Sequence, residues 1–179
     1  MVAAGAVVVL AAVVAVVHGT GDDTPAADGA SGRVAVQRQG GSRVGEQATA
    51  FRATTMTGGE FTLPAGKPVV LFFMAVWCNP QLEASALDRI ERDLDGRMAV
   101  LGVDADPSEP LATLRGFADR IGARYGYVRD GDGALSRAFG VQAMDTTIVV
   151  DAAGRIAFRD SVPTDEATLR AAISKVAQA

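Results

Sequence analysis

The most constraining feature of the sequence is a continuous apolar run, residues 69–76, that leads directly into the only cysteine of the chain, Cys78. A short run rich in Val and Phe is typical of a strand buried on both faces of a sheet. Because proline is preorganised for the first turn of a helix, we expect a helix to begin at Asn79 and Pro80. Cys78 is thus predicted to lie between a core strand and a helix N-terminus, where partial positive charge and free N–H groups favour thiolate over thiol.

Composition excludes several classes of function. The chain has 179 residues and a formal net charge of −4, a size that suits one folded domain with additional segments. Its Lys and Arg residues are scattered rather than clustered, so nothing indicates a nucleic-acid partner. A single cysteine excludes an intrachain disulfide and a cysteine-based zinc site. No cofactor is expected.

The first part of the chain is predicted to lie outside the folded domain. Residues 2–17 are an unbroken run of Val, Ala, Gly and Leu, close to the length of about 17 residues that a spanning helix needs. No basic residues precede the run and no convincing small-x-small cleavage site comes before Asp22. We therefore expect residues 1–18 to be a membrane anchor or an uncleaved signal. Residues 19–47 contain few large apolar side chains and are expected to be a flexible tether, followed by a domain over residues 48–179.

Periodicity and turn signals predict an α/β domain. The chain is expected to begin with a hairpin over residues 50–63 that turns at 57–60, followed by the core strand and a helix from Cys78 to Asp95. A strand over 98–103, a helix capped by Ser108 and ending at 121, and a short strand over 127–129 come next. The last elements are a short helix over 134–139, a hairpin over 146–159 and a helix capped by Thr164. On the helix after Cys78, Glu83 is expected to point outward. Crossover helices between buried strands imply a mixed central sheet with helices on both faces.

The motif around the cysteine resembles a known active site. The segment Trp77-Cys78-Asn79-Pro80-Gln81 is similar to the Trp-Cys-x-Pro-Cys segment of the thioredoxin superfamily. Residues 102–104 and 141–156 resemble their counterparts in the TlpA/ResA group of extracytoplasmic thioredoxin-like proteins. The resemblance covers roughly residues 50–179. It implies a thioredoxin-like fold, thiol–disulfide oxidoreductase ancestry, and a domain held outside the cytoplasm at the cell membrane.

One departure from that pattern removes the second cysteine. In the family, the first cysteine attacks a substrate disulfide and the second resolves the mixed disulfide, but Gln81 stands at the second position. Cys78 can attack, whereas turnover has to borrow a thiol from a small molecule or a partner protein. Gln81 can at most offer an amide hydrogen bond to the sulfur.

A second departure lies opposite the cysteine. The family has a cis-proline just before Thr146, and the matching residue here is Asp145. A non-proline cis bond costs about 3–4 kcal/mol, so the Met144–Asp145 bond is expected to be trans. A carboxylate facing Cys78 would oppose thiolate formation. Alternatively, Asp145 caps the following turn and points away.

A third departure concerns proton handling. Members of the TlpA/ResA group often carry a Glu three residues after the second cysteine, where it moves protons. The matching position is Ala84, with Glu83 beside it and expected on another face. The buried acid on the core strand of thioredoxin corresponds to Phe72. The proton-handling groups of a dithiol enzyme are therefore expected to be absent.

These observations leave three functional hypotheses. The first is a monothiol oxidoreductase in which Cys78 is the nucleophile and forms mixed disulfides with a protein or a low-molecular-weight thiol. The second is a non-catalytic thioredoxin-fold binding module at the membrane surface, in which Cys78 is vestigial or regulatory. The third is Cu(I) handling through Cys78 and Met144, since soft sulfur ligands suit Cu(I). In each case a monomeric domain is expected, with a site shaped by Trp77, Asn79, Pro80, Gln81, Met144, Asp145 and Thr146.

Overall fold

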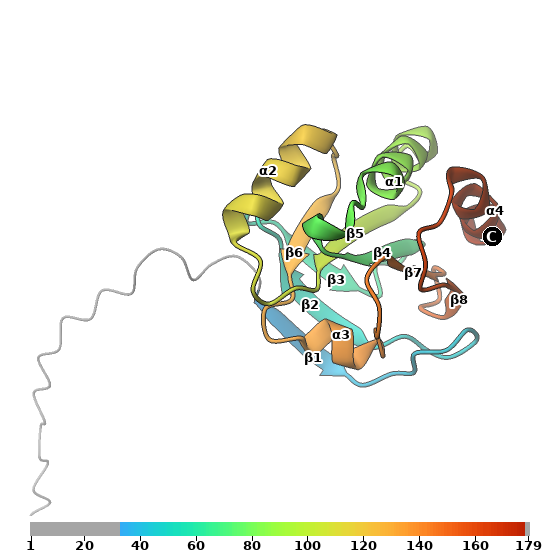
Figure 1. Cartoon of the computed structure of the whole chain (residues 1–179). Coiled ribbons are helices and arrows are strands. Elements are labelled where there is room, and N and C mark those ends of the chain that lie inside the picture. Colours follow the sequence, from blue (N-terminus) through green and yellow to red (C-terminus); the bar gives the residue numbers. More distant parts are fainter. Residues whose placement is uncertain (1–32, 178–179) are drawn as a thin grey trace, which may run out of the picture.

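The computed structural model describes residues 33–177 (Figure 1). The predicted anchor, residues 1–18, and the first part of the predicted tether lie outside the described residues. Within the described range, none of the helices is both long and apolar enough to cross a membrane.

A five-stranded mixed sheet forms the centre of the domain, as predicted. Its strand order is β6 (Gly126–Arg129), β5 (Ala99–Asp104), β4 (Val69–Met74), β7 (Thr146–Val150) and β8 (Ile156–Arg159). Strand β4 is parallel to β5 and antiparallel to β7, and all six of its residues are buried. The apolar run that precedes the cysteine is therefore the middle strand of the sheet.

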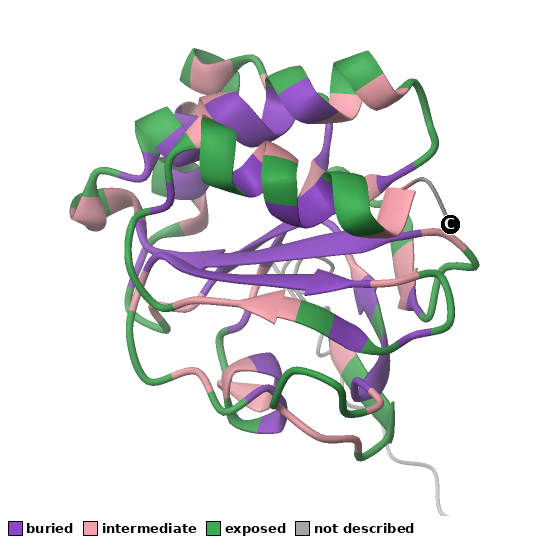
Figure 2. Ribbon diagram, turned by 90° about the vertical axis from the view of Figure 1, so that its right-hand side faces the viewer, coloured by how far each residue is buried: buried purple, intermediate pink, exposed green. Residues whose placement is uncertain are grey.

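Helices cover both faces of this sheet (Figures 1 and 2). One face carries α1 (Gln81–Leu94), α2 (Leu111–Ile121) and α4 (Glu166–Ala177); the other carries α3 (Ala134–Ala138) and a three-stranded sheet of β1 (Val34–Arg38), β2 (Ala50–Thr54) and β3 (Glu60–Leu63). Alternate residues of β4 serve the two cores, because side chains along a strand point to opposite faces. Phe72 belongs to the core under α1, α2 and α4, and Phe73 to the core on the α3 side.

The predicted tether extends too far into the domain. Residues 34–38 form β1, which pairs antiparallel with β2. The polar composition of residues 19–47 as a whole obscured a five-residue strand in which Val34 and Val36 alternate with smaller or polar residues. Such a strand is stabilised by its ladder with β2, which lies more than ten residues further along the chain.

Two predicted helix caps are also wrong. Helix α2 begins at Leu111 after Pro110, and Ser108 instead donates its hydroxyl to the carboxylate of Asp106 at 2.6 Å. At α4, the carboxylate of Asp165 accepts a hydrogen bond from the backbone N–H of Thr168 at 2.8 Å. Thr164 donates its hydroxyl to Asp160. In both segments an aspartate, a stronger acceptor than a hydroxyl, takes the available donors.

Replacing Asp165 with Ala should therefore lower the midpoint of urea unfolding, because the helix loses an N-cap acceptor. Asp165→Asn keeps a capping oxygen and is the matched control, expected to unfold at nearly the same urea concentration as the parent. Urea unfolding of the full chain measures both. Equal loss in the two variants would contradict a capping role.

Candidate functional site

Cys78 lies at the end of a short 3₁₀ turn rather than in α1. The turn η1 (Val76–Cys78) follows β4, and the N–H of Cys78 donates to the carbonyl of Ala75 at 3.0 Å. Asn79 then adopts the left-handed conformation, with φ 61° and ψ 48°. Pro80 occupies the N-cap position of α1, which begins at Gln81. The sulfur is thus placed ahead of the helix N-terminus, not within its first turn.

The surroundings of Cys78 oppose ionisation of its thiol. Burial raises the pKa of Cys78, and the carboxylates of Asp145, Glu109 and Asp106 raise it further. The expectation that the helix N-terminus would favour the thiolate is wrong in direction. Burial of the thiol and the charges of the three acidic side chains outweigh the stabilisation of the thiolate by the N-terminus of α1.

The two acids from the β5–α2 loop are fixed by the turn itself. The carboxylate of Glu109 accepts a hydrogen bond from the N–H of Val76 at 2.9 Å, and that of Asp106 accepts one from the indole N–H of Trp77 at 2.8 Å. Trp77 is nevertheless 64% exposed. It is therefore held beside the cysteine by a hydrogen bond and not by burial in the core.

The segment before β7 supplies the other side of the site. The described residues contain one cis peptide bond, Leu63–Pro64, so Met144–Asp145 is trans, as predicted. Asp145 has φ 55°, in the left-handed region that Asp enters more readily than most residues. The hydroxyl of Thr146 donates to the carbonyl of Ala143 at 2.8 Å and closes this turn. Met144 is half-buried, whereas Asn79 and Gln81 are exposed.

Asp145 faces the site. It is 7% exposed, and its Oδ1 has no hydrogen-bond partner among the described residues. The charge of its carboxylate raises the pKa of Cys78. Burial raises the pKa of Asp145 itself. Of the two alternatives left open by the sequence, the structure supports the one in which this carboxylate opposes the thiolate.

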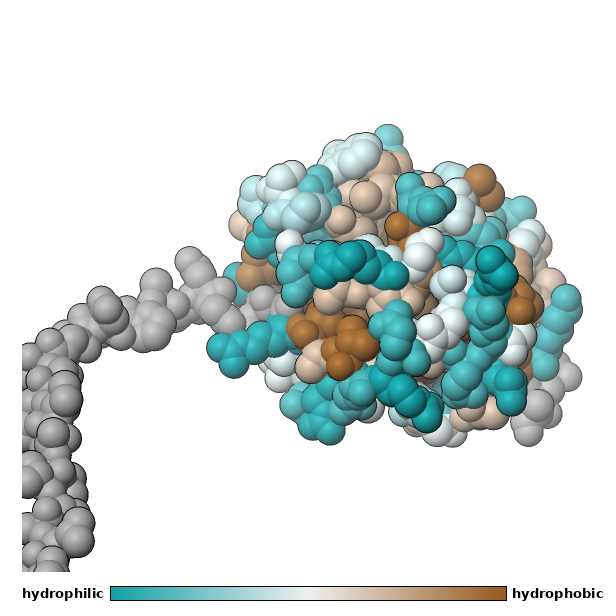
Figure 3. Space-filling view, turned by 90° about the horizontal axis from the view of Figure 1, so that it is seen from below, coloured by the Kyte–Doolittle hydropathy of each residue, from teal (hydrophilic) through white to brown (hydrophobic). Residues whose placement is uncertain are grey.

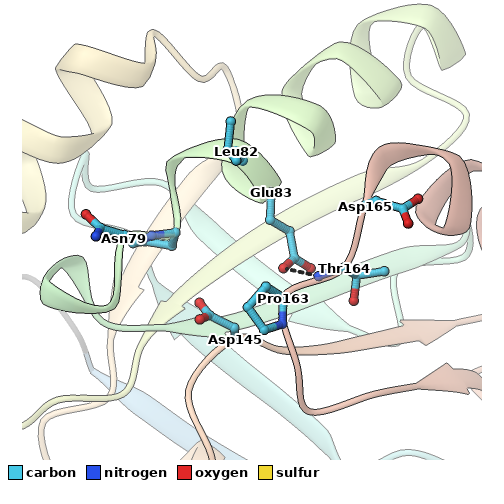
Figure 4. A pocket seen from close by; sticks show the side chains of 8 residues that line it. Asn79, Leu82, Glu83, Asp145, Pro163, Thr164 and Asp165 are labelled. Carbon is cyan, nitrogen blue, oxygen red and sulfur yellow. Dashed lines mark hydrogen bonds between the residues drawn. The ribbon is translucent and has the colours of Figure 1, made fainter.

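Sequence reasoning missed Glu83, which was expected to point outward. Glu83 is 4% exposed; Thr147 donates its hydroxyl to one carboxylate oxygen, and the N–H of Thr164 donates to the other at 3.0 Å (Figure 4). Burial, together with the charges of Asp160 and Asp145, raises the pKa of Glu83 from 4.5 to about 7. A signal was available, because Glu83 precedes two core residues of α1, Leu87 and Ile90, at the spacing of a single helix face.

A second buried acid lies behind the cysteine turn. Asp104 ends β5 and is fully buried, and its Oδ2 has no hydrogen-bond partner among the described residues. Burial and the neighbouring Glu109 raise the pKa of Asp104 to about 7. A charged residue that ends an otherwise apolar strand was the sequence signal for this group.

Asp145 and Glu83 share a pocket of about 240 Å³ beside the cysteine turn (Figure 4). Its walls come from the first turn of α1, the segment before β7 and the loop between β8 and α4: Asn79, Pro80, Leu82, Glu83, Asp145, Pro163, Thr164 and Asp165. The lining combines three acidic residues with apolar surface and includes no Lys, Arg or His. Within residues 33–177, no group of three or more His, Cys, Asp or Glu side chains is arranged to hold a metal ion.

Comparison with known proteins identifies the family. The model of the AhpC/TSA family matches residues 44–159, well over half of the chain. The chain belongs to the AhpC/TSA family. Among curated proteins, it is 28% identical over 124 residues to the thioredoxin-like protein YneN of Bacillus subtilis, covering 67% of this chain and 72% of that protein.

Two further curated relatives are similar to the chain. It is 36% identical over 107 residues to the mercury resistance operon ORF3 protein of Streptomyces lividans, covering 57% of each protein. It is 29% identical over 119 residues to the thiol-disulfide oxidoreductase ResA of Halalkalibacterium halodurans, covering 64% of this chain and 66% of that protein. The chain therefore spans only part of these relatives.

Solved structures confirm the thioredoxin-like fold of this AhpC/TSA member. A thiol:disulfide interchange protein of Chlorobium tepidum superposes with a TM-score of 0.63 at 21% identity, covering 73% of this chain and 95% of that chain. StoA of Bacillus subtilis gives a TM-score of 0.60 at 18% identity, covering 69% and 95%. Together with the sequence relatives, they confirm the resemblance to the TlpA/ResA group.

The high pKa of Glu83 predicts how stability changes with pH. Between about pH 4.5 and about pH 7 the unfolded chain loses the Glu83 proton while the folded domain keeps it, so this group lowers stability as pH rises. Glu83→Gln removes that contribution and can still accept the N–H of Thr164. The variant should therefore lose less stability than the parent between pH 5 and pH 8.

Urea unfolding of the full chain at several pH values measures this difference. Asp160, Asp145 and Tyr125 also lie near Glu83, and Asp104 changes stability with the same sign, so the stability of Glu83→Gln is still expected to depend on pH. The test is therefore the difference between the pH profiles of the variant and the parent. Parallel profiles for the two proteins would show that Glu83 titrates at its ordinary pKa.

Proposed function

We propose that this AhpC/TSA member is a membrane-tethered, extracytoplasmic thiol–disulfide exchange protein that acts through one cysteine. Cys78 would form mixed disulfides with a disulfide-bearing protein or a low-molecular-weight disulfide. The observation that supports this most directly is the half-buried Cys78 between exposed Trp77 and the Asp145 segment, with Gln81 in place of a resolving cysteine. The relatives named thiol-disulfide oxidoreductases favour the same chemistry.

The exchange takes place in two steps. Cys78 loses its proton to solvent, its thiolate attacks one sulfur of the partner disulfide, and the other sulfur departs as a thiolate that takes up a proton. The mixed disulfide then persists until an external thiolate attacks the partner's sulfur and releases Cys78. Gln81 cannot perform this second attack.

The raised pKa of Cys78 slows both steps. A higher pKa increases the nucleophilicity of a thiolate with a Brønsted slope of only about 0.4–0.5, so the loss of thiolate at neutral pH outweighs the gain. A thiol of high pKa is also a poor leaving group when the mixed disulfide is cleaved. Both formation and release of the mixed disulfide are therefore expected to be slow.

One observation also favours the second candidate, a binding module. Trp77 and Leu82, 64% and 87% exposed, present large apolar side chains on the two segments that flank Cys78 and the pocket. Such side chains are typical of protein-binding surfaces. Cu(I) handling through Cys78 and Met144 has two soft ligands to support it and stays a prediction.

Trapping the mixed disulfide tests the proposed function. The full chain is incubated with glutathione disulfide at pH 7 to 9, and mass spectrometry follows the adduct on Cys78. We expect slow formation that accelerates with pH and release by added dithiothreitol. Gln81→Cys supplies an internal resolving thiol, so its adduct should not accumulate, while Cys78→Ser should form none. If the parent forms no adduct at any pH, the binding module becomes the preferred function.

Electrostatic opposition to the thiolate is tested separately by alkylation. Removing the Asp145 charge in Asp145→Asn should lower the apparent pKa of Cys78, measured from the pH dependence of its reaction with iodoacetamide. Asn also tolerates the left-handed backbone at this position. Asp119→Asn, an exposed acid on α2, is the control and should leave the pKa unchanged. Identical profiles for the parent and Asp145→Asn would mean that Asp145 does not act on the sulfur.

A further inference from the structure

The ionisable side chains that line the pocket beside the cysteine turn are all acidic. We call it the acidic pocket, defined by its lining residues Asn79, Pro80, Leu82, Glu83, Asp145, Pro163, Thr164 and Asp165. Glu83 and Asp145 contribute carboxylates from two different segments, and Asp160 lies close enough to act on Glu83. Asp165 also lines the pocket, but its carboxylate accepts the N–H of Thr168 at the start of α4. No cationic side chain in the lining offsets them.

An unpaired oxygen points to a missing donor. Asp145 is 7% exposed, its Oδ1 has no hydrogen-bond partner among the described residues, and its carboxylate extends into the space between Asn79, Glu83 and Pro163 (Figure 4). Buried polar groups are nearly always hydrogen-bonded, and a buried carboxylate without a donor is costly. Glu83, by contrast, already accepts hydrogen bonds from Thr147 and Thr164.

The remaining walls are apolar. Pro80, Leu82 and Pro163 line the pocket without offering a hydrogen-bond donor from their side chains, and Leu82 is largely exposed at the rim. At about 240 Å³, the pocket is smaller than the roughly 300–1,000 Å³ sites that take drug-sized ligands. Its size and lining suit one extended, side-chain-sized group with an apolar stem and a positively charged end.

We propose that the acidic pocket binds an ammonium or guanidinium group on an aliphatic stem, with the charged end at Asp145 and Glu83 and the stem along Pro80, Leu82 and Pro163. A lysine or arginine side chain of the protein captured by Cys78 carries this chemistry, and so does a free alkylamine. As a statement about the partner of Cys78, this inference rests on the proposed function. Binding to the pocket itself does not require disulfide exchange.

The position of Asp145 couples the acidic pocket to the cysteine. Its carboxylate lines the pocket and also acts on Cys78, where it opposes the thiolate. A cation paired with Asp145 offsets that negative charge, so an occupied pocket ionises Cys78 more readily. A partner that brings a cationic side chain thereby activates the thiol that captures it.

Alkylation of the full chain by iodoacetamide at pH 7.5 tests pocket binding without any disulfide. Added n-butylammonium, which reproduces the lysine stem and head group, should raise the rate at Cys78 in a saturable way at constant ionic strength. A shift of half a pKa unit corresponds to roughly a threefold rate increase. Neutral n-butanol and potassium chloride are the matched controls and should have no such effect.

Variants show which residues are responsible for the increase in the alkylation rate. The increase should be lost in Asp145→Asn, weakened in Glu83→Gln and retained in Asp119→Asn. Because Asp145→Asn removes the coupling as well as one binding group, isothermal titration of n-butylammonium into Cys78→Ser, with and without Glu83→Gln, measures binding directly. An equal response to potassium chloride and n-butylammonium, or an undiminished increase in Asp145→Asn, would overturn the proposal.

Two peptide disulfides then distinguish the sources of the cation. Each carries one cysteine capped as a disulfide with 2-nitro-5-thiobenzoate, and they differ only in a lysine or a norleucine near that cysteine. Faster exchange of the lysine peptide with Cys78 supports a partner side chain; equal rates, with n-butylammonium still binding, assign the pocket to free amines. If neither peptide reacts while n-butylammonium still accelerates alkylation, the exchange function fails and the acidic pocket stands.

Discussion

The pairing of β4 with β7 is the constraint on which the site depends. Because β4 is buried on both faces between β5 and β7, the place where it ends is fixed, and Cys78 follows in a turn of three residues. The antiparallel register pairs Phe73 with Thr146, so the residue before Thr146 comes opposite the end of β4. The sheet therefore sets Asp145 against the cysteine turn, whatever side chain occupies the position.

Charge then decides what this geometry can do. A strand–turn–helix segment carries the thiol just ahead of α1, but burial and the charges of acids on two loops raise the pKa of Cys78. Two of these acids also hold the turn, through the N–H of Val76 and the indole of Trp77. The groups that fix the position of the sulfur are therefore the same groups that lower its reactivity. Conditions that neutralise these acids change both the position of the sulfur and its reactivity.

Local sequence patterns predicted the elements well because those elements are defined by neighbours in the chain. The apolar run of β4, the turn at residues 57–60 and the end of α1 at Asp95 follow from composition and turn chemistry. The burial of Glu83 was harder to predict, since its carboxylate accepts a hydrogen bond from Thr164, eighty-one residues away along the chain. Strand β1 depends in the same way on β2. The acidic surroundings of Cys78 were the most difficult feature to predict, because Asp106, Glu109 and Asp145 come together only once the sheet has formed.

The departures at positions 81 and 145 have different physical consequences. Gln81 is exposed at the start of α1, so its side chain can change without moving the backbone. Asp145 adopts φ 55°, which a proline locked near −65° cannot reach. The backbone of the segment opposite Cys78 therefore differs from that of a cis-proline loop. The acidic pocket is formed in part by that backbone and by the carboxylate it carries, so a second cysteine at position 81 would supply a resolving thiol without restoring the family's substrate groove.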